Sequence, residues 1–204
     1  MCKARQVLQE CVKLKVLHTV CVRRVAGCSL HIRMRHDYIA PQDYQAIREH
    51  LTNSRYQLLI DLSYWTGQQW CILLNIRIKD VYSDGEALPK LIIKTRAHYQ
   101  RNRVAIPIHP QLREILADTI LPNYCETWLF ESKVNPGQPI CFEAGVVALR
   151  NAVAKARLRG RGISPNSFRY SFVRRLLEQG MEPDKIRRLS CHSHVDGVIH
   201  LAKA

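Results

Sequence analysis

Apolar residues recur at helical spacing along the first half of the ordered sequence. Pro41 suits the first position of a helix, and Tyr44 and Ile47 follow on one face. A second helix can start at Ser54 and stop at Gly67, because Gly is the residue that most readily ends a helix in the left-handed conformation. Both segments are predicted to turn an apolar face toward a core.

The same pattern predicts further helices and one β-hairpin. Residues 91–95 (LIIKT) and 103–108 (RVAIPI) are expected as two strands joined by the basic loop RAHYQRN, and residues 127–130 (TWLF) as a short edge segment. The remaining helices are expected at about 70 to 77, from Pro110 to about Leu121, from Phe142 to about Leu158, from Ser164 to Gly180, and as a last short one from Pro183 through Leu189. The predicted fold class is α+β and mostly helical: a multihelical domain of six or seven helices with a small antiparallel sheet.

Composition limits the functional class. The chain has 204 residues, is 47% apolar and carries a net charge of +14, which favours one globular domain with nucleic acid as its partner. The eight cysteines are scattered without a CxxC pair, which indicates reduced thiols inside the cell. Neither a long apolar run nor a secretory signal is present. We therefore expect a cytoplasmic, nucleoid-associated protein with no membrane contact.

The charge is concentrated in two parts of the chain. Residues 1–37 carry eight Lys or Arg against Glu10 and Asp37, and are interpreted as a basic arm or as the remnant of a lost domain. Residues 38–204 form the predicted domain, in which eleven basic residues gather between Arg150 and Cys191. The predicted DNA-binding residues are Arg96, Arg101, Arg157, Arg159, Arg161, Asn166, Arg169 and Arg174.

The nonapeptide SPNSFRYSF, residues 164–172, lies inside this basic region. Ser164 and Pro165 mark a helix start, so Asn166 and Arg169 are expected side by side on the first turn, facing outward. The free N–H groups and the dipole of a helix N-terminus attract phosphate. The stretch is therefore predicted to grip a nucleic-acid backbone.

Four stretches resemble, in order, motifs of the catalytic domain of the tyrosine recombinases, the phage integrase family. TGQQWCILLNIR (66–77) is similar to that family's Thr-Gly-x-Arg-x-x-Glu-Leu-Leu-x-Leu helix, and SPNSFRYSF resembles its Ser-Pro-His-x-Leu-Arg-His-Ser-Phe box. IRRLSCHSH (186–194) resembles its Leu-Gly-His segment, and the predicted hairpin matches the one that carries the family's lysine. The resemblance implies a fold that binds DNA and, in active members, cleaves it through a tyrosine that attacks phosphorus.

The resemblance also implies which catalytic positions are kept and which are changed. Lys94, Arg169 and His192 match the hairpin lysine, the second arginine and the second histidine. The changed positions are Gln69 for the first arginine, Ile72 for the acidic residue, Asn166 for the first histidine and Leu201 for the nucleophilic tyrosine. Neither an amide nor leucine can replace the lost acid–base and nucleophilic groups.

Other residues could in principle supply a nucleophile. No tyrosine follows Tyr170, which is expected inside a helix that packs into the core, and the chain ends soon after Leu201, where relatives usually continue. Ser193 and His194 are of suitable chemical type, but nothing in the sequence specifies their geometry. The resemblance therefore favours an inactive site.

Three functions remain open at this point. The favoured one is a degenerate recombinase-like domain that binds duplex DNA, with an active recombinase or a second copy of the chain as a further partner. The alternatives are a recombinase with an unrecognised nucleophile and a module that binds RNA or protein. No cofactor is expected, and a metal site is set aside because the spacing of its possible ligands fits no familiar zinc pattern. Those ligands are Cys191, His192, His194 and His200.

Overall fold

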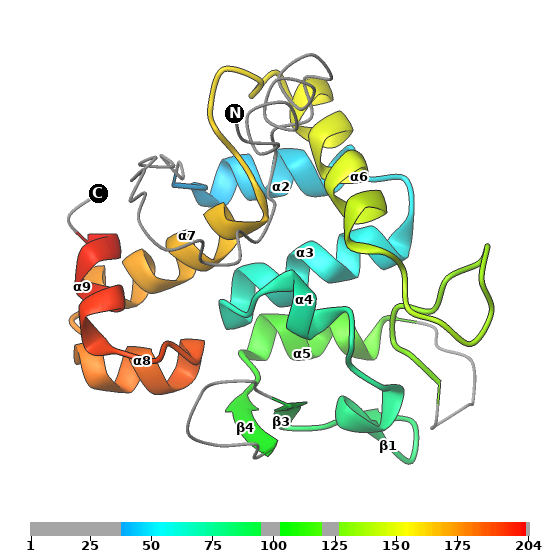
Figure 1. The fold of residues 1–204 in the computed structure, drawn as a ribbon, viewed down its shortest axis with the longest axis horizontal. Helices are drawn as coiled ribbons and strands as arrows, with labels where there is room; N and C mark the ends of the chain where they lie inside the picture. The colour runs from blue at the N-terminus through cyan, green and yellow to red at the C-terminus, as the bar shows by residue number, and fades with distance from the viewer. Residues whose placement is uncertain (1–37, 95–102, 120–126, 203–204) are drawn as a thin grey trace, which may run out of the picture. The chain divides into compact units, whose positions relative to one another are not determined.

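A computed structural model of the protein describes residues 38–94, 103–119 and 127–202. They belong to one compact unit of α-helices with two short antiparallel hairpins (Figure 1), so the predicted mostly helical α+β class is confirmed. The helices are α2 (Pro41–Glu49), α3 (Ser54–Thr66), α4 (Trp70–Leu73), the 3-10 turn η1 (Ile78–Asp80), α5 (Pro110–Ala117), α6 (Phe142–Lys155), α7 (Pro165–Glu178), α8 (Pro183–Ser190) and α9 (Val195–Ala202). The strands are β1 (Tyr82–Ser83), β2 (Glu86–Ala87), β3 (Lys90–Lys94) and β4 (Arg103–Pro107).

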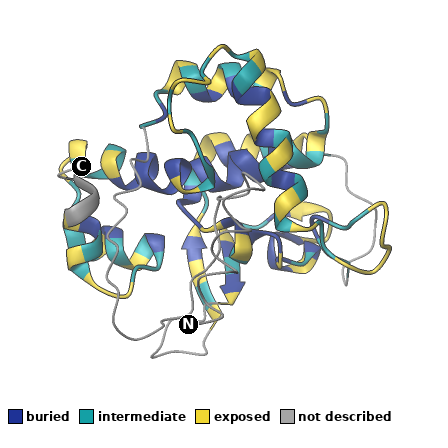
Figure 2. Ribbon diagram, turned by 45° about the horizontal axis from the view of Figure 1, so that its top comes forward, coloured by how far each residue is buried: buried dark blue, intermediate teal, exposed yellow. Residues whose placement is uncertain are grey.

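Helix α3 lies at the centre and touches α2, α4, α5, α6 and α7 (Figure 1). Its N-terminus is capped by the side chain of Asn53, which accepts a hydrogen bond from the Arg55 amide at 2.9 Å. The helix ends at Gly67, which has a φ of 65°. Because α3 is buried on several sides, most of its residues are dark blue in Figure 2 and it acts as the axis of the core.

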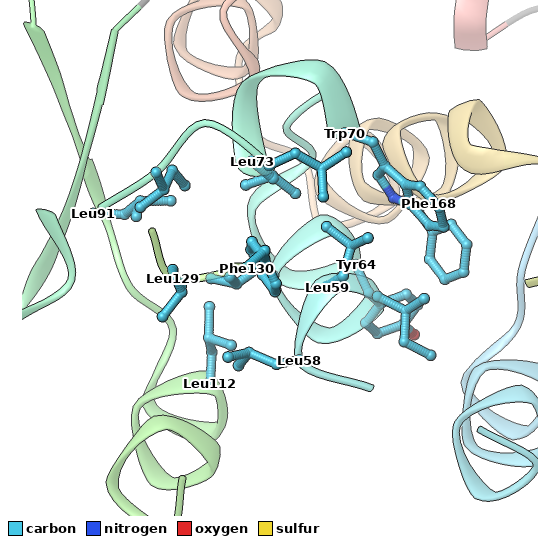
Figure 3. Close-up of a cluster of buried hydrophobic side chains, with 14 of the residues drawn as sticks. Leu58, Leu59, Tyr64, Trp70, Leu73, Leu91, Leu112, Leu129, Phe130 and Phe168 are labelled. Atoms are coloured by element: carbon cyan, nitrogen blue, oxygen red, sulfur yellow. The ribbon is translucent and has the colours of Figure 1, made fainter. Parts of the chain in front are cut away.

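One continuous hydrophobic core surrounds α3 (Figure 3). Side chains from helices and from the β3–β4 hairpin meet there and are almost fully buried. The labelled members are Leu58, Leu59 and Tyr64 of α3, Trp70 and Leu73 of α4, Leu91 of β3, Leu112 of α5, Leu129 and Phe130 of the segment before α6, and Phe168 of α7.

The two hairpins differ in how well the sequence indicated them. Strands β3 and β4 pair antiparallel in the expected place, with Leu91 opposite Ile106 and both side chains buried. The β1–β2 hairpin was not predicted. It turns at Asp84 and Gly85, whose φ angles are 53° and 83°. An Asp-Gly pair is a strong signal for such a turn, so this hairpin could have been found from the sequence.

Two arginines fix α2 and α7 to α3. Arg48 of α2 forms an ion pair with the fully buried Asp61 at 2.9 Å, and the Tyr44 hydroxyl donates to the same carboxylate at 2.6 Å. Arg175 of α7 lies over the Tyr64 ring, with its Cζ 3.6 Å from the ring centroid. Each contact satisfies a polar group that the packing would otherwise leave buried without a partner.

The length of α4 and the number of helices differ from the prediction. Helix α4 is only four residues long, because residues 76–78 turn aside to pair with the predicted edge segment 127–130. The helix that begins at Pro183 is not the last, since α9 follows it. The described residues therefore hold eight α-helices rather than six or seven. In this part of the chain no helix combines the length and the apolar character that a membrane crossing requires.

Replacing Gly67 by Ala is expected to destabilise the domain by about 2 to 4 kcal/mol, because an L-residue is strained at positive φ and the pocket is full. A Cβ at Gly67 would lie 2.3 Å from Cδ1 of Phe172. Gly85→Ala is the matched control: Gly85 also has positive φ, but nothing lies within 4 Å of its Cβ position, so the loss should be about 1 kcal/mol. Urea unfolding measures both. Equal losses would show that Phe172 does not constrain Gly67.

Candidate functional site

Arg169 is the centre of the candidate site. It lies one turn into α7 and is 8% exposed. Its Nε donates to Nε2 of His192 at 3.2 Å, and its Nη1 donates to the Gly67 carbonyl at 3.0 Å. Burial lowers the pKa of the Arg169 guanidinium to about 10, which still leaves it charged at neutral pH. The structure thus holds a fixed, buried cation between two acceptors.

Three elements meet at this cation. Gly67 ends α3, Arg169 comes from α7, and His192 follows the C-terminus of α8. Gln68 connects two of these elements, because its side-chain Nε2 donates to the carbonyls of Thr66, at 3.1 Å, and Leu189, at 2.8 Å. The turn after α3 is therefore tied to the end of α8, and both acceptors of Arg169 are held in register.

One nitrogen of Arg169 remains available. Among the described side chains, the buried atoms without a partner are Trp65 Nε1, Gln68 Oε1 and Trp70 Nε1. Nη2 of Arg169 is not one of them, although no hydrogen bond to a described residue holds it. Nη2 is therefore the nitrogen of Arg169 whose donors no described residue takes.

The sequence predicted that Asn166 and Arg169 face outward side by side, and this prediction is wrong. Asn166 is exposed at the start of α7, whereas Arg169 is turned inward. The helix begins where expected: Ser164 is the N-cap, Pro165 is the first helical residue, and the Ser164 amide donates to Oγ of Ser167 at 3.0 Å. Arg169 lies one turn further on and is covered by the turn after α3 and by His192.

His192 is held on both sides of its ring. Nε2 accepts from Arg169, and Nδ1 lies 2.6 Å from Oγ of Ser190, which in turn donates to the Ile186 carbonyl at 2.6 Å. Burial, and then the charge of Arg169, lower the pKa of His192 to about 4. The imidazole is therefore neutral at physiological pH.

The other sequence-predicted catalytic positions lie on several different elements. Gln69 is exposed at the N-cap of α4, and Lys94 is exposed at the end of β3, opposite Arg103. The backbone of Leu201 belongs to α9, which packs against α7 and α8. Ile72 is partly buried against the core. The structure shows no hydrogen bond from Gln69 or Lys94 to Arg169 or His192.

The predicted DNA-binding cations differ in their surroundings. Arg157 and Arg159 are exposed just after α6. Arg161 forms an ion pair with Asp43 at 2.5 Å, and Arg174 forms one with Glu178 at 2.8 Å. Arg96 and Arg101 lie outside the described residues. Among the predicted DNA-binding arginines that the structure describes, Arg157 and Arg159 are exposed and form no ion pair with a described residue.

The possible replacement nucleophiles have different surroundings. Tyr170 is buried, as expected. Burial raises the pKa of the Cys191 thiol, although Arg169 opposes the shift, so the thiol stays protonated at neutral pH. Ser193 and His194 are exposed beyond α8. In the described part of the chain, no group of His, Cys, Asp or Glu side chains is arranged to hold a metal ion.

A cleft of about 960 Å³ lies elsewhere, between α2, α3, α5 and α7. Its walls include Trp65, stacked on His109 with ring centroids 4.4 Å apart, and Arg175. None of the sequence-predicted site residues lines it. Because Arg175 already braces α7 against α3, we assign the cleft to the packing of the core helices rather than to the site.

Four residues that matter here escaped the prediction: Gly67 as an acceptor, Gln68, Ser190 and Cys191. Cys191 has a φ of 54° and ends α8 in the left-handed conformation, at the place where the Leu-Gly-His segment has glycine. The glycine of the family motif at this position was the only signal for the turn, and this chain has cysteine there. The roles of Gln68 and Ser190 depend on contacts across the fold, which no spacing in the sequence indicates.

Comparison with known proteins places this geometry in context. The model of the Phage integrase family matches residues 37–201. The XerA recombinase structure is similar with a TM-score of 0.65 and 14% identity, over 81% of this chain and 59% of that one. The XerH recombinase bound to difH substrate, in a pre-cleavage complex, has a TM-score of 0.64 and 16% identity, over 82% and 50%. A lambda integrase dimer bound to a COC′ core site has a TM-score of 0.63 and 17% identity, over 97% and 56%.

These likenesses concern the fold, because the sequence identities are low. This chain spans 59% of XerA, 50% of XerH and 56% of the lambda integrase chain. A search of curated proteins found no match. The family assignment therefore rests on the match over residues 37–201, and the structures support its architecture.

We predict a pH dependence from His192. The folded protein holds this ring neutral, with a pKa of about 4, whereas an unfolded histidine titrates near 6.5. The unfolded state therefore takes up the proton first, and this contribution to the free energy of unfolding is lost as the pH falls from 6.5 toward 4. NMR titration of the imidazole C–H signals should show His192 unprotonated at pH 5.5. Arg169→Met should raise its pKa, and a wild-type midpoint near 6.5 would contradict the buried geometry.

Proposed function

The chain belongs to the phage integrase family, and from this premise we propose that it binds the phosphate backbone of duplex DNA without cleaving it. The observation that carries the proposal is the guanidinium of Arg169, fixed between the turn after α3 and the end of α8, with no hydrogen bond from Nη2 to a described residue. A cation held in place in this way loses little conformational entropy when it binds phosphate.

The start of α7 supports the same interaction. The exposed Asn166 side chain can donate a hydrogen bond to a phosphate oxygen, and the first N–H groups of a helix have no partner within the helix. The positive end of the helix dipole adds to the attraction. Asn166 at the helix start and Arg169 one turn later are the two residues of α7 that we propose as phosphate contacts.

The surrounding charge favours a polyanion over a single anion. The net charge is +14, and Arg157 and Arg159 are exposed close to the start of α7 in the sequence. We propose these two residues as backbone contacts. Arg96, Arg101, Arg161 and Arg174 remain weaker candidates, because two lie outside the described residues and two already form intramolecular ion pairs. Affinity should fall with salt, with a log–log slope of roughly −0.9 for each phosphate neutralised.

Strand cleavage requires groups that the motif positions no longer supply. Gln69 can donate a hydrogen bond but carries no charge, and Asn166 cannot transfer a proton near neutral pH. At the position of the nucleophilic tyrosine the chain has Leu201. The loss of the nucleophile abolishes cleavage whatever the other groups contribute, because residual electrostatics cannot replace a missing covalent step. Lys94 and His192 are then retained for binding and for structure rather than for proton transfer.

Known structures guide the choice of partner. XerH and lambda integrase were solved on DNA sites, and the Tn1549 integrase was solved with transposon right end DNA. By analogy of fold we propose duplex DNA as the partner of this chain, within the nucleoid. An active recombinase or a second copy of the chain is the protein partner we propose, since the lambda integrase structure is a dimer.

Asn166→Asp tests the phosphate contact. The new carboxylate should weaken binding to duplex DNA by roughly fivefold to tenfold, as expected for about 1 kcal/mol of repulsion. It should also stabilise the folded protein by about 0.3 to 1 kcal/mol, because an anion is favourable at a helix N-terminus. Fluorescence anisotropy and urea unfolding measure the two effects. Asn135→Asp, in the exposed loop before α6, makes the same charge change and should affect binding much less. Equal effects on binding would show that the start of α7 is not a contact.

A suicide DNA substrate, which traps a covalent intermediate when the cut strand dissociates, tests the absence of cleavage. We expect no protein–DNA adduct on a denaturing gel, since Leu201 cannot attack phosphorus. An active tyrosine recombinase on its own substrate serves as the positive control. An adduct that forms with this protein would refute the proposal, and mapping it would identify the nucleophile.

A further inference from the structure

The hydrogen bonds around His192 permit only one form of its ring. Arg169 Nε always carries a proton, so Nε2 of His192 must accept and is unprotonated. The Ser190 hydroxyl donates its proton to the Ile186 carbonyl, so Nδ1 of His192 must be the donor to Ser190 Oγ. Two independent contacts thus give the same answer: a neutral imidazole protonated at Nδ1.

From this we propose that His192 and Ser190 are positioning residues for Arg169. Ser190 favours the tautomer of His192 that is protonated at Nδ1, and the ring uses its Nε2 lone pair to hold Arg169 Nε. Since that lone pair is occupied and Nε2 has no proton, His192 does not itself donate to a phosphate. This inference rests on the proposed function only for the identity of the anion that Arg169 binds.

The surroundings of the ring leave it little freedom. The His192 amide donates to the Arg187 carbonyl at 3.0 Å, which anchors the backbone to the last turn of α8. On the α9 side, a Cβ added at Gly197 would lie 3.4 Å from Cδ2 of His192, so the helix lies close to that edge of the ring. The ring is therefore held by α8, α9 and Arg169 together.

Ser190 is suited to positioning and not to reaction. It is fully buried, so its hydroxyl cannot reach a substrate. In the Leu-Gly-His segment that IRRLSCHSH resembles, the position of Ser190 is occupied by leucine, which offers no hydrogen bond. The hydroxyl is thus a feature of this chain, and it replaces an apolar contact with a bond that sets the state of the neighbouring imidazole.

Nitrogen-15 NMR of the imidazole tests this directly in the free protein. At pH 7 we expect the Nδ1 of His192 to give the signal of a protonated nitrogen and Nε2 that of an unprotonated acceptor. Adding a short DNA duplex should leave both assignments unchanged, because the ring does not donate to phosphate. A ring protonated at Nε2, or at both nitrogens once DNA is bound, would overturn the inference.

Variants of Ser190 separate positioning from folding. Ser190→Ala removes one of the two contacts that select the Nδ1-protonated ring, so the share of the Nε2-protonated tautomer should rise, and DNA binding should weaken by about threefold to tenfold, the factor expected for one lost hydrogen bond. Ser190→Thr keeps the hydroxyl and should restore both the spectrum and the affinity. Ser54→Ala, at an exposed serine at the start of α3, is the control and should change neither. An unchanged His192 spectrum in Ser190→Ala would refute the role of Ser190.

The two proposals fail in different ways. If the protein binds no DNA but His192 is protonated at Nδ1 and responds to Ser190→Ala, the proposed function is wrong and the positioning role stands. If DNA binds but His192 is protonated at Nε2, the positioning role is wrong and the proposed function stands. The free-protein spectrum and the binding curve therefore decide the two questions independently.

Discussion

The structure of the site depends on the burial of one charge. A guanidinium removed from water is costly unless its donors find acceptors, and Arg169 finds them in the Gly67 carbonyl and in His192. Those acceptors come from the end of α3 and the end of α8. Satisfying one arginine therefore ties three helices together, and it leaves Nη2 as the nitrogen of this side chain that no described residue holds.

This arrangement separates holding a phosphate from breaking one. Holding it requires donors that are fixed in space and a positive potential, and the groups that we propose for this are Arg169, the start of α7 and the exposed arginines after α6. Breaking it requires a nucleophile and groups that exchange protons during the reaction. The motif positions for those groups carry Gln69, Asn166 and Leu201. His192 is retained, but its lone pair is occupied by the arginine beside it.

Local signals predicted most elements well. Proline at the first position and glycine or a polar cap at the ends identified α2, α3, α7 and α8, because these residues act within one turn of the backbone. Helix α4 was predicted too long, since its sequence is helical in pattern but its last residues pair with the distant segment 127–130. The β1–β2 turn was missed although Asp84 and Gly85 signal it.

The sequence by itself determined the fold class, the family resemblance and the identity of the retained and replaced motif residues. These depend on residue type and spacing, which are local properties. Only the tertiary structure decided that Arg169 is buried while Asn166 is exposed, that Gly67 and His192 hold its guanidinium, and that Ser190 lies within hydrogen-bond distance of His192. Each of these facts arises where helices far apart in the chain pack together. Burial and hydrogen-bond partners depend on that packing, so no pattern within a single segment determines them.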